Sequence, residues 1–338
     1  MRQETIRRLT SIGLLALLFL IFGLTNDKFF TAPNILTLLR ECAVTGIMAV
    51  GVTMVIITAG IDLSAGGMVG FISMFCMNLL YYLKLPAELV ILAALGMGVL
   101  CGLLNGALVS FLRLPDFIAT LSTQFLFRGL TYMLAVRNDF GMIINQRITN
   151  PGILILGGSI NGVYIVTIAF LCIAAAGQFI LKGTRLGTYT YAIGANRRSA
   201  ELSGISFIKI KLSVFGITGL LCGLASLFLM ARIGSVIPDT GMGLEFDVIA
   251  AVVMGGCAFS GGRGDAVGTV IGAVFMTALI NGIYKYNLPT AAQLIIKGLV
   301  IVLMVIFDSL YNRYMHNRAL HSGSRAGLVE NGVSAKEG

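Results

Sequence analysis

The sequence predicts an all-α protein that spans a membrane about ten times. Hydrophobic residues make up 57% of its 338 positions, and charged residues only 12%. An average soluble domain carries about 25% charged residues, so this chain lacks the polar surface that water would require on every side. Apolar runs of about the 20 residues that a helix needs to cross the hydrocarbon core recur along its whole length. We therefore expect a polytopic helical membrane protein.

Ten apolar runs are the predicted spans. In chain order they are Leu9–Leu24, Ile35–Ala59, Ala65–Leu83, Ala87–Leu112, Phe117–Val136, Val163–Lys182, Ile208–Ala231, Phe246–Phe259, Ala266–Ile283 and Ala291–Phe307. No small-residue cleavage site follows the first run, so we interpret it as a retained span rather than a signal peptide. The spans divide the chain into a cytoplasmic N-terminus at residues 1–8, a transmembrane domain at 9–310 and a disordered cytoplasmic tail at 311–338.

Lysine and arginine indicate the orientation of the spans. Fifteen of the 24 basic residues fall on the side that would hold both termini: Arg2, Arg7, Arg8, Arg113, Lys182, Arg185, Arg197, Arg198, Lys209, Lys211, Arg263, Arg313, Arg318, Arg325 and Lys336. Six fall in the opposite loops, and three lie within spans. Cytoplasmic loops are rich in Lys and Arg, so we predict cytoplasmic termini. The net charge of +9 follows from this topology and does not indicate nucleic-acid binding.

A polar island, YAIGANRRSAELSGI at Tyr191–Ile205, interrupts the apolar pattern. Its three charged residues would be costly in hydrocarbon, so the island must face water. Asn196 is a suitable N-cap and Gly204 a suitable stop for a short helix between them. We interpret this segment as a helix that is presented outside the bilayer to a soluble partner. The alternative for each charge is a solvated loop face.

Glycines at four-residue spacing predict close packing between helices. Gly98, Gly102 and Gly106 form one such set, Gly219 and Gly223 a second, and Gly264, Gly268 and Gly272 a third. Residues four apart share one face of a helix, and small residues there let a neighbouring backbone approach closely. A role as sliding surfaces during a conformational cycle is the alternative.

Two junctions between spans, TAGIDLSAGG at Thr58–Gly67 and GGCAFSGGRGD at Gly255–Asp265, are richer in glycine and serine than ordinary turns. Broken helices of this kind line polar cavities in transporters. The candidates for a translocation path are Thr58, Asp62, Ser64, Asn105, Arg128, Ser260, Gly261 and Gly262. Asp62 has a second interpretation as a cap of the helix that follows it. Arg128 lies within a span, where a charge is costly unless it pairs, snorkels or faces water.

Several function classes lack their usual motifs. The chain has no G-x-x-x-x-G-K-[ST] pattern, so any ATP must be hydrolysed by a partner. It has no H-E-x-x-H or G-x-S-x-G pattern of an intramembrane enzyme. The six cysteines form no C-x-x-C pair, so we expect no metal and no cofactor. An ion-coupled secondary transporter stays open, although the acidic or histidine residues that it needs in mid-span are scarce.

Three stretches carry a resemblance to a known family: GVTMVIITAGIDLSAGG, the polar island, and the run from DVIAAVVMGGCAFSGGRGDAVGTVIGA to IIKGLVIVLMVIFD. They resemble the permease subunits of bacterial ABC sugar importers, of which the ribose permease is the best known. The resemblance extends from about Asn34 to Asp308. The chain departs from the family pattern at Asp116, where proline is common, and near Cys257, where a hydrophobic residue is common.

The resemblance implies a non-catalytic transport subunit of the bacterial inner membrane. Two permease subunits, identical or different, would form the pore within membrane lipid. A cytoplasmic ABC ATPase would drive alternating access through a coupling loop at residues 183–207, and a periplasmic binding protein would deliver a pentose or hexose. The coupling residues are Ala192, Gly194, Asn196, Arg197, Arg198, Ala200, Glu201, Ser203 and Gly204. Branched-chain amino acid permeases are the related alternative, and the sequence names no particular sugar.

Overall fold

The structure, a computed structural model, describes residues 2–137, 141–286, 288–289, 291–303 and 306. The chain forms two compact units, Met1–Leu288 and Pro289–Gly338. The second unit contains a short apolar helix, Ala291–Leu303. The predicted disordered tail at 311–338 and the end of the last predicted span at Phe307 lie outside the described residues.

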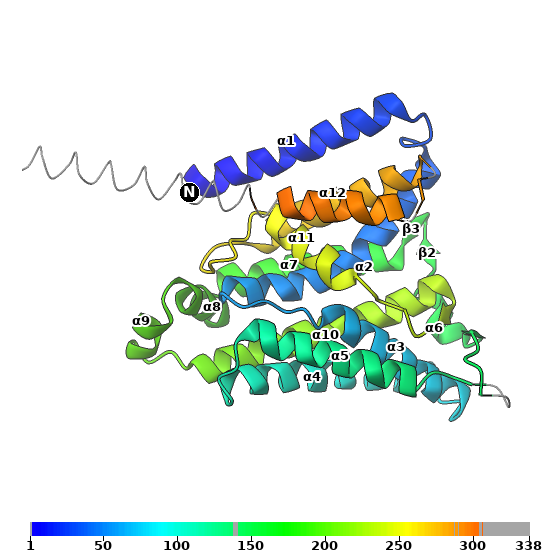
Figure 1. Cartoon of the computed structure of the whole chain (residues 1–338), viewed down its shortest axis with the longest axis horizontal. Helices are drawn as coiled ribbons and strands as arrows, with labels where there is room; N and C mark the ends of the chain where they lie inside the picture. The colour runs from blue at the N-terminus through cyan, green and yellow to red at the C-terminus, as the bar shows by residue number, and fades with distance from the viewer. Residues whose placement is uncertain (1, 138–140, 287, 290, 304–305, 307–338) are drawn as a thin grey trace, which may run out of the picture. The chain divides into compact units, whose positions relative to one another are not determined.

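The first unit consists of helices joined by turns (Figure 1). Its helices are α1 (Arg2–Thr25), α2 (Ala32–Ile57), α3 (Ala65–Tyr81), α4 (Ala87–Ser110), α5 (Asp116–Met133), α6 (Pro151–Ile155), α7 (Ile165–Gly183), α8 (Arg185–Ala195), α9 (Arg197–Leu202), α10 (Phe207–Ile233), α11 (Leu244–Met254) and α12 (Ala266–Tyr284). Two short antiparallel pairs accompany them: β1 (Gln146–Arg147) with β4 (Ser235–Val236), and β2 (Ser159–Ile160) with β3 (Val163–Tyr164).

Each apolar run predicted from the sequence contains a helix. Nine of these helices are α1 to α5, α7 and α10 to α12, and the tenth run contains Ala291–Leu303. Within the described residues, five helices are long and apolar enough to cross a membrane: α2, α4, α7, α10 and α12. The prediction of a helical membrane protein is therefore confirmed, whereas the ten crossings and the side of the termini stay predictions.

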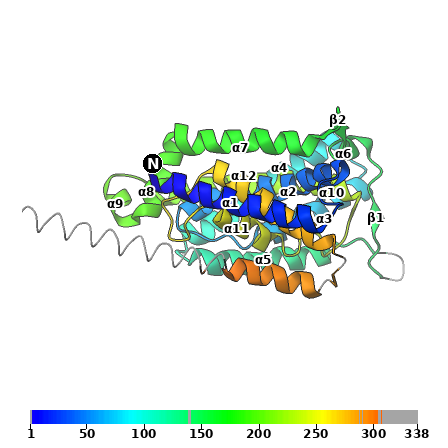
Figure 2. The ribbon, with the colours of Figure 1, turned by 90° about the horizontal axis from the view of Figure 1, so that it is seen from above.

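The long helices of the first unit run between two ends. α8 and α9 project at one end, and the start of α1 lies at this same end in Figure 1 and in Figure 2. α6 and the β2–β3 pair lie at the opposite end (Figure 1). The predicted topology requires the N-terminus and the polar island to share a side, and this arrangement satisfies it.

α10 is the central helix, and it packs against both α4 and α2. The glycines at four-residue spacing on α4 and α10 make the contact between these two helices. A Cβ atom at Gly98 would overlap the Gly219 carbonyl and lie 3.1 Å from the Cα atom of Gly223. A Cβ atom at Gly223 would lie 2.5 Å from the Ala94 carbonyl oxygen. The predicted close approach is therefore confirmed for these two sets.

The third glycine set needs a correction. Gly268 and Gly272 lie on α12 and pack against Gly255 and the end of α11. Gly264 precedes the helix, has φ 143°, and faces the Cys257 side chain instead. The prediction that all three share one helix face was wrong, because α12 begins at Ala266, after its N-cap Asp265, and Gly264 therefore lies outside the helix.

We expect Gly98→Val to destabilise the protein, because the new side chain would overlap the backbone of α10. Overpacking of this kind costs about 1–3 kcal/mol, and a rigid backbone neighbour favours the upper part of that range. Loss of folded protein on heating in detergent measures the effect. Gly96→Val is the matched control, since a Cβ atom at Gly96 would meet nothing within 4 Å. Equal losses in both variants would contradict the proposed packing.

Candidate functional site

Three segments that are distant in sequence meet where α8 and α9 project: the end of α2, the glycine turn between α11 and α12, and α8 itself. The backbone amide of Gly262 donates to the carbonyl oxygen of Ile57 at 2.8 Å. A Cβ atom at Gly194 would lie 2.6 Å from this same amide nitrogen, which leaves no room for a side chain. The three motifs thus form one backbone contact, here named the glycine joint (Ile57, Gly194, Gly261 and Gly262).

The predicted path candidates of the second junction belong to this joint or border it. Gly261 has φ 80°, and a Cβ atom there would lie 2.8 Å from both the Ala59 nitrogen and the Gly194 oxygen. Only glycine combines such a φ with so little space. Ser260 is exposed beside them. Packing alone therefore accounts for Gly261 and Gly262.

The polar island folds into two short helices, of which the sequence predicted one. The Asn196 side chain accepts from the Ser199 amide at 3.0 Å and caps α9. Beyond the helix, the amide of Gly204 (φ 83°) donates to Glu201 and that of Ile205 donates to Ala200. This pair of hydrogen bonds is a Schellman motif. The predicted cap and stop are both confirmed. α8 was missed because its glycines and threonines lower helix propensity.

α9 has a buried side and an exposed side. Ala200 is buried in a cluster with Ile57 and Phe207, and so holds α9 against the helices. Arg197 lies 3.6 Å from the Phe207 ring centroid. It also pairs with Glu201 across one helical turn at 3.1 Å.

The outer surface of α9 joins Arg198 and Ser203, both exposed, to Leu202, which is 83% exposed. Of the island charges, Arg197 and Glu201 thus already have each other as partners. Leu202 was missed by the sequence analysis. An apolar residue just before the predicted stop of a water-facing helix was the available signal.

The first junction is held in an extended form by buried polar side chains. Asp62 accepts from the Ser64 amide at 2.8 Å and from the Ser64 hydroxyl at 2.6 Å. Asn105 donates to the Ser64 hydroxyl oxygen at 2.7 Å, and Thr123 donates to Asn105 at 2.6 Å. Three of the predicted path candidates, Asp62, Ser64 and Asn105, are therefore brought into one hydrogen-bond network.

Thr120 binds the same extended stretch from α5. Its hydroxyl donates to the Ile61 carbonyl oxygen at 3.0 Å and accepts from the Leu63 amide at 3.1 Å. This stretch is not helical, so its backbone groups lack the partners that a helix would provide. Thr120 supplies a partner for these two partly buried groups. Thr58, at the start of the stretch, is also buried and lies beside the Lys211 ammonium, which donates to its hydroxyl oxygen at 2.9 Å.

Arg128 lies on α5 and reaches across to the turn before α11. It donates to the carbonyl oxygens of Pro238 and Thr240 at 3.1 and 2.9 Å. Tyr132, one turn along α5, donates to Asp239 at 2.6 Å. Glu245, in the first turn of α11, is only 6% exposed, and like Arg128 it lies against the glycines of α3. We name this surface, Arg128, Tyr132, Asp239 and Glu245, the charged face.

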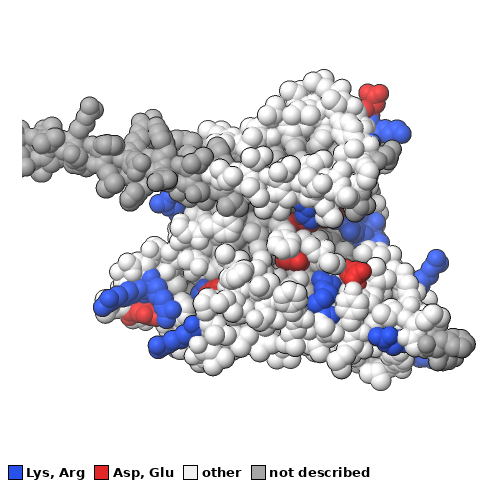
Figure 3. Space-filling view, in the orientation of Figure 1, with Lys and Arg blue, Asp and Glu red and all other residues white. Residues whose placement is uncertain are grey.

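Glycines of α3 make room for the charged face. A Cβ atom at Gly70 would lie 3.0 Å from the Arg128 guanidinium, and one at Gly66 would overlap the Glu245 carboxylate. In Figure 3, acidic and basic side chains gather in the middle of the visible surface, between the positions of α11 and α5. Asp239 and Glu245 were missed because they are close to Arg128 in space and far from it in sequence.

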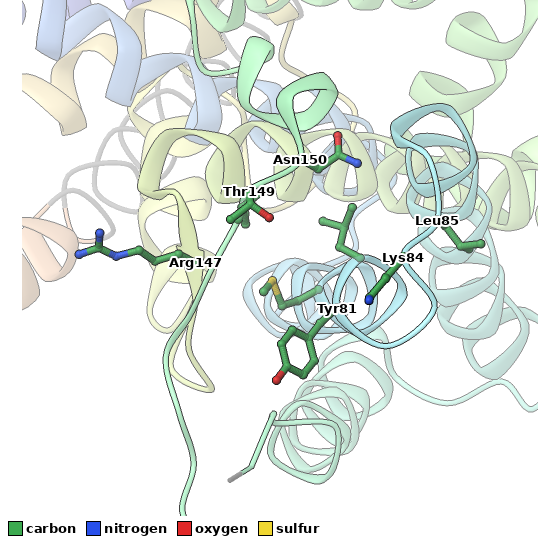
Figure 4. A pocket seen from close by; sticks show the side chains of 9 residues that line it. Tyr81, Lys84, Leu85, Arg147, Thr149 and Asn150 are labelled. Carbon is green, nitrogen blue, oxygen red and sulfur yellow. The ribbon is translucent and has the colours of Figure 1, made fainter.

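A pocket of about 340 Å³ lies at the opposite end of the molecule, between the turn after α3 and the segment that leads into α6 (Figure 4). Its lining includes Tyr81, Lys84, Arg147 and Asn150. In Figure 4 the Lys84 side chain points toward Tyr81, whereas the hydroxyl end of Tyr81 and the Arg147 side chain point away from Lys84. The lining carries two basic side chains and no acidic one.

Comparison with known proteins gives a consistent result. Residues 34–305 match the family described as branched-chain amino acid transport system / permease component. The chain is 37% identical to the ribose import permease protein of Escherichia coli K12, over 88% of this chain and 92% of that protein. It is 37% identical to the ribose import permease of Bacillus subtilis over 87% and 90%. It is 31% identical to the xylose transport system permease of Escherichia coli K12 over 89% and 91%. No solved structure matches this chain.

We expect Asn196→Ala to loosen α9, because the Ser199 amide loses its acceptor. Loss of an N-cap costs about 1 kcal/mol, so amide hydrogen exchange in residues 197–203 should quicken about fivefold. Asn196→Asp is the matched control, because aspartate caps as well as asparagine. Unchanged exchange in the alanine variant would contradict the capping role.

Proposed function

This chain belongs to the family of membrane permease components named after the branched-chain amino acid transport system, and we propose that it is the membrane-spanning subunit of an ABC sugar importer. The observation that carries the proposal is similarity over nearly the full length to permeases whose names specify ribose and xylose. The subunit itself is non-catalytic, and a partner ATPase supplies the energy. It resides in the inner membrane of a bacterium.

We propose that the end with α8 and α9 is cytoplasmic and that all ten apolar runs cross the bilayer. The excess of Lys and Arg on this side supports the orientation. The start of α1 lies at the same end (Figure 1). The C-terminus, after an even number of crossings, is then cytoplasmic as well.

The coupling function belongs to α8 and α9 in this proposal. Arg198, Leu202 and Ser203 form the surface offered to the ATPase, since they are exposed and Arg197 and Glu201 already pair with each other. The caps at Asn196 and Gly204 fix the shape of that surface. Behind it, Ala192 and Gly194 on α8 connect it to the glycine joint. Movement of α8 would therefore displace the broken ends of α2 and α11 together.

The charged face is the best candidate for a wall of the translocation path. Ionisable residues within membrane-spanning segments are costly and are candidates for substrate pathways, and Arg128 lies within a predicted span. A second permease subunit, identical or different, would supply the opposite wall. The extracytoplasmic binding protein would approach at the end with Lys84 and Arg147, where basic side chains suit acidic partners. Apolar side chains exposed on α4 and α7 would face lipid; they include Leu92, Leu100, Leu171 and Phe179.

A pentose or another sugar is the favoured substrate, because the relatives named for a substrate specify ribose and xylose. A branched-chain amino acid is the alternative that the family description suggests. Uptake assays in vesicles that hold the permease, its ATPase and its binding protein separate the two. Saturable, ATP-dependent uptake of labelled ribose or xylose supports the proposal. Uptake of labelled leucine alone would replace the sugar with an amino acid, and ion-gradient-driven uptake without ATP would overturn the proposal.

We expect Arg198→Glu to weaken ATPase docking without unfolding the spans, because the Arg198 side chain is exposed on α9. A loss of about 1.4 kcal/mol lowers the affinity about tenfold, so at least that reduction in co-purified ATPase is expected. Arg113→Glu is the matched control, since it reverses an exposed charge at the same end but outside the coupling loop. Equal ATPase retention in both variants, with normal transport, would contradict the docking surface.

A further inference from the structure

An ion pair lies buried just below the coupling loop. The Lys211 ammonium on α10 pairs with the carboxylate of Asp116, the first residue of α5. The Lys211 side chain is 2% exposed and that of Asp116 is 18% exposed. From the sequence alone, Lys211 counted as one of the basic residues of the cytoplasmic surface. The structure instead puts its charge inside the protein.

The surroundings of this pair are built to hold it. The ammonium also donates to the Thr58 hydroxyl oxygen at 2.9 Å, which brings in the end of α2. A Cβ atom at Gly60 would lie 2.7 Å from the ammonium nitrogen, so only glycine leaves the space that the pair occupies. The rings of Phe207 and Phe215 lie 5.7 and 5.8 Å from the same nitrogen. One ammonium thus joins α2, α5 and α10.

A continuous line of contacts runs from the pair to the coupling helix. Phe207, which flanks Lys211, also lies beneath the Arg197 guanidinium at 3.6 Å. Arg197 is the first residue of α9. At the other end of the line, Asp116 starts the helix that carries Arg128 of the charged face. The line therefore leads from the surface offered to the ATPase to a wall of the path.

A buried ion pair is weak evidence of a stabilising role. The cost of removing two charges from water often exceeds their attraction, so an apolar pair of similar size is frequently as stable or more stable. The retention of this pair at the meeting point of three helices favours a role in how those helices move together.

We propose that the Asp116–Lys211 ion pair is a positioning element that transmits movement of α9 to α5, and so couples ATP hydrolysis to substrate movement. The inference rests on the proposed function. The pair contacts neither substrate nor nucleotide. It makes the start of α5 follow α10 and the end of α2, and the charged face then moves with the coupling loop.

The test uses the complete complex in lipid vesicles, with labelled ribose uptake and ATP hydrolysis measured together. The variants are Asp116→Asn, Lys211→Met, both together, and the exchanged pair Asp116→Lys with Lys211→Asp. Each neutral variant should lower the ribose moved per ATP by at least about fivefold, the lower end of typical coupling between sites. ATP hydrolysis and bound ATPase should stay near the wild-type level. The exchanged pair should restore part of the ribose moved per ATP.

The double neutral variant separates coupling from folding, because it leaves no charge unpaired in the interior. A folded double variant that moves as much ribose per ATP as the wild type overturns the inference. Lys209→Met is the matched control, because Lys209 is exposed two residues away on the same helix, and it should keep the wild-type ratio. A wild-type complex with no ATP-dependent uptake of ribose or xylose would instead overturn the proposed function and this inference with it.

Discussion

The arrangement depends on one constraint: a helix that breaks off inside the protein must find partners there for its freed backbone groups. α2 and α11 both end at such breaks, and each break helps to satisfy the other, since the Gly262 amide donates to the Ile57 carbonyl. The extended stretch after α2 is satisfied by Thr120 on α5. The breaks are therefore fixed points at which α2, α5, α8 and the turn before α12 are tied together. The glycine at position 194 follows from the same requirement, because a Cβ atom there would overlap the hydrogen-bonded Ile57 carbonyl and Gly262 amide.

The few charged residues that the structure describes lie either at the surface or beside polar partners in the interior. Those at the surface of the end with α8 and α9 serve the proposed partner contact. The buried or partly buried charges include Asp62, Arg128, Glu245 and the Asp116–Lys211 pair. Arg128 donates to the carbonyl oxygens of Pro238 and Thr240, Lys211 pairs with Asp116, and Asp62 accepts two hydrogen bonds from Ser64. This is what the cost of charge in a low-dielectric medium demands. Arg128 of the charged face and Asp116 of the ion pair lie on the same helix, so in our proposal α5 relates the path to the partner.

Sequence reasoning succeeded where the responsible physics is local. Hydropathy located a helix in each predicted run, the caps of α9 follow from the chemistry of Asn196 and Gly204, and the spacing of Gly98, Gly219 and Gly223 predicted a real contact. It failed where the outcome depends on tertiary neighbours. Nothing near Lys211 in the chain reveals that Asp116 will neutralise it, and nothing near Glu245 reveals Arg128. The α8 helix forms despite weak propensity, with Gly194 packed at the joint and Gly187 packed against the end of α7. Gly264 fits the periodicity by coincidence, since the helix starts after it.

The glycine joint has a mechanical consequence. Two side chains in contact absorb a small displacement by changing rotamer, but backbone atoms already at van der Waals distance have no such slack. At Gly194, α8 meets the end of α2 and the turn before α12 through backbone atoms. The Tyr191 hydroxyl of α8 adds a hydrogen bond to the Gly264 carbonyl oxygen in the same turn. No side chain at Gly194 can change rotamer to take up a small displacement of α8. Close packing would pass it on to two helices that the chain separates by about two hundred residues. The glycine joint is therefore expected to be stiff, because the absence of side chains lets the three backbone segments touch directly.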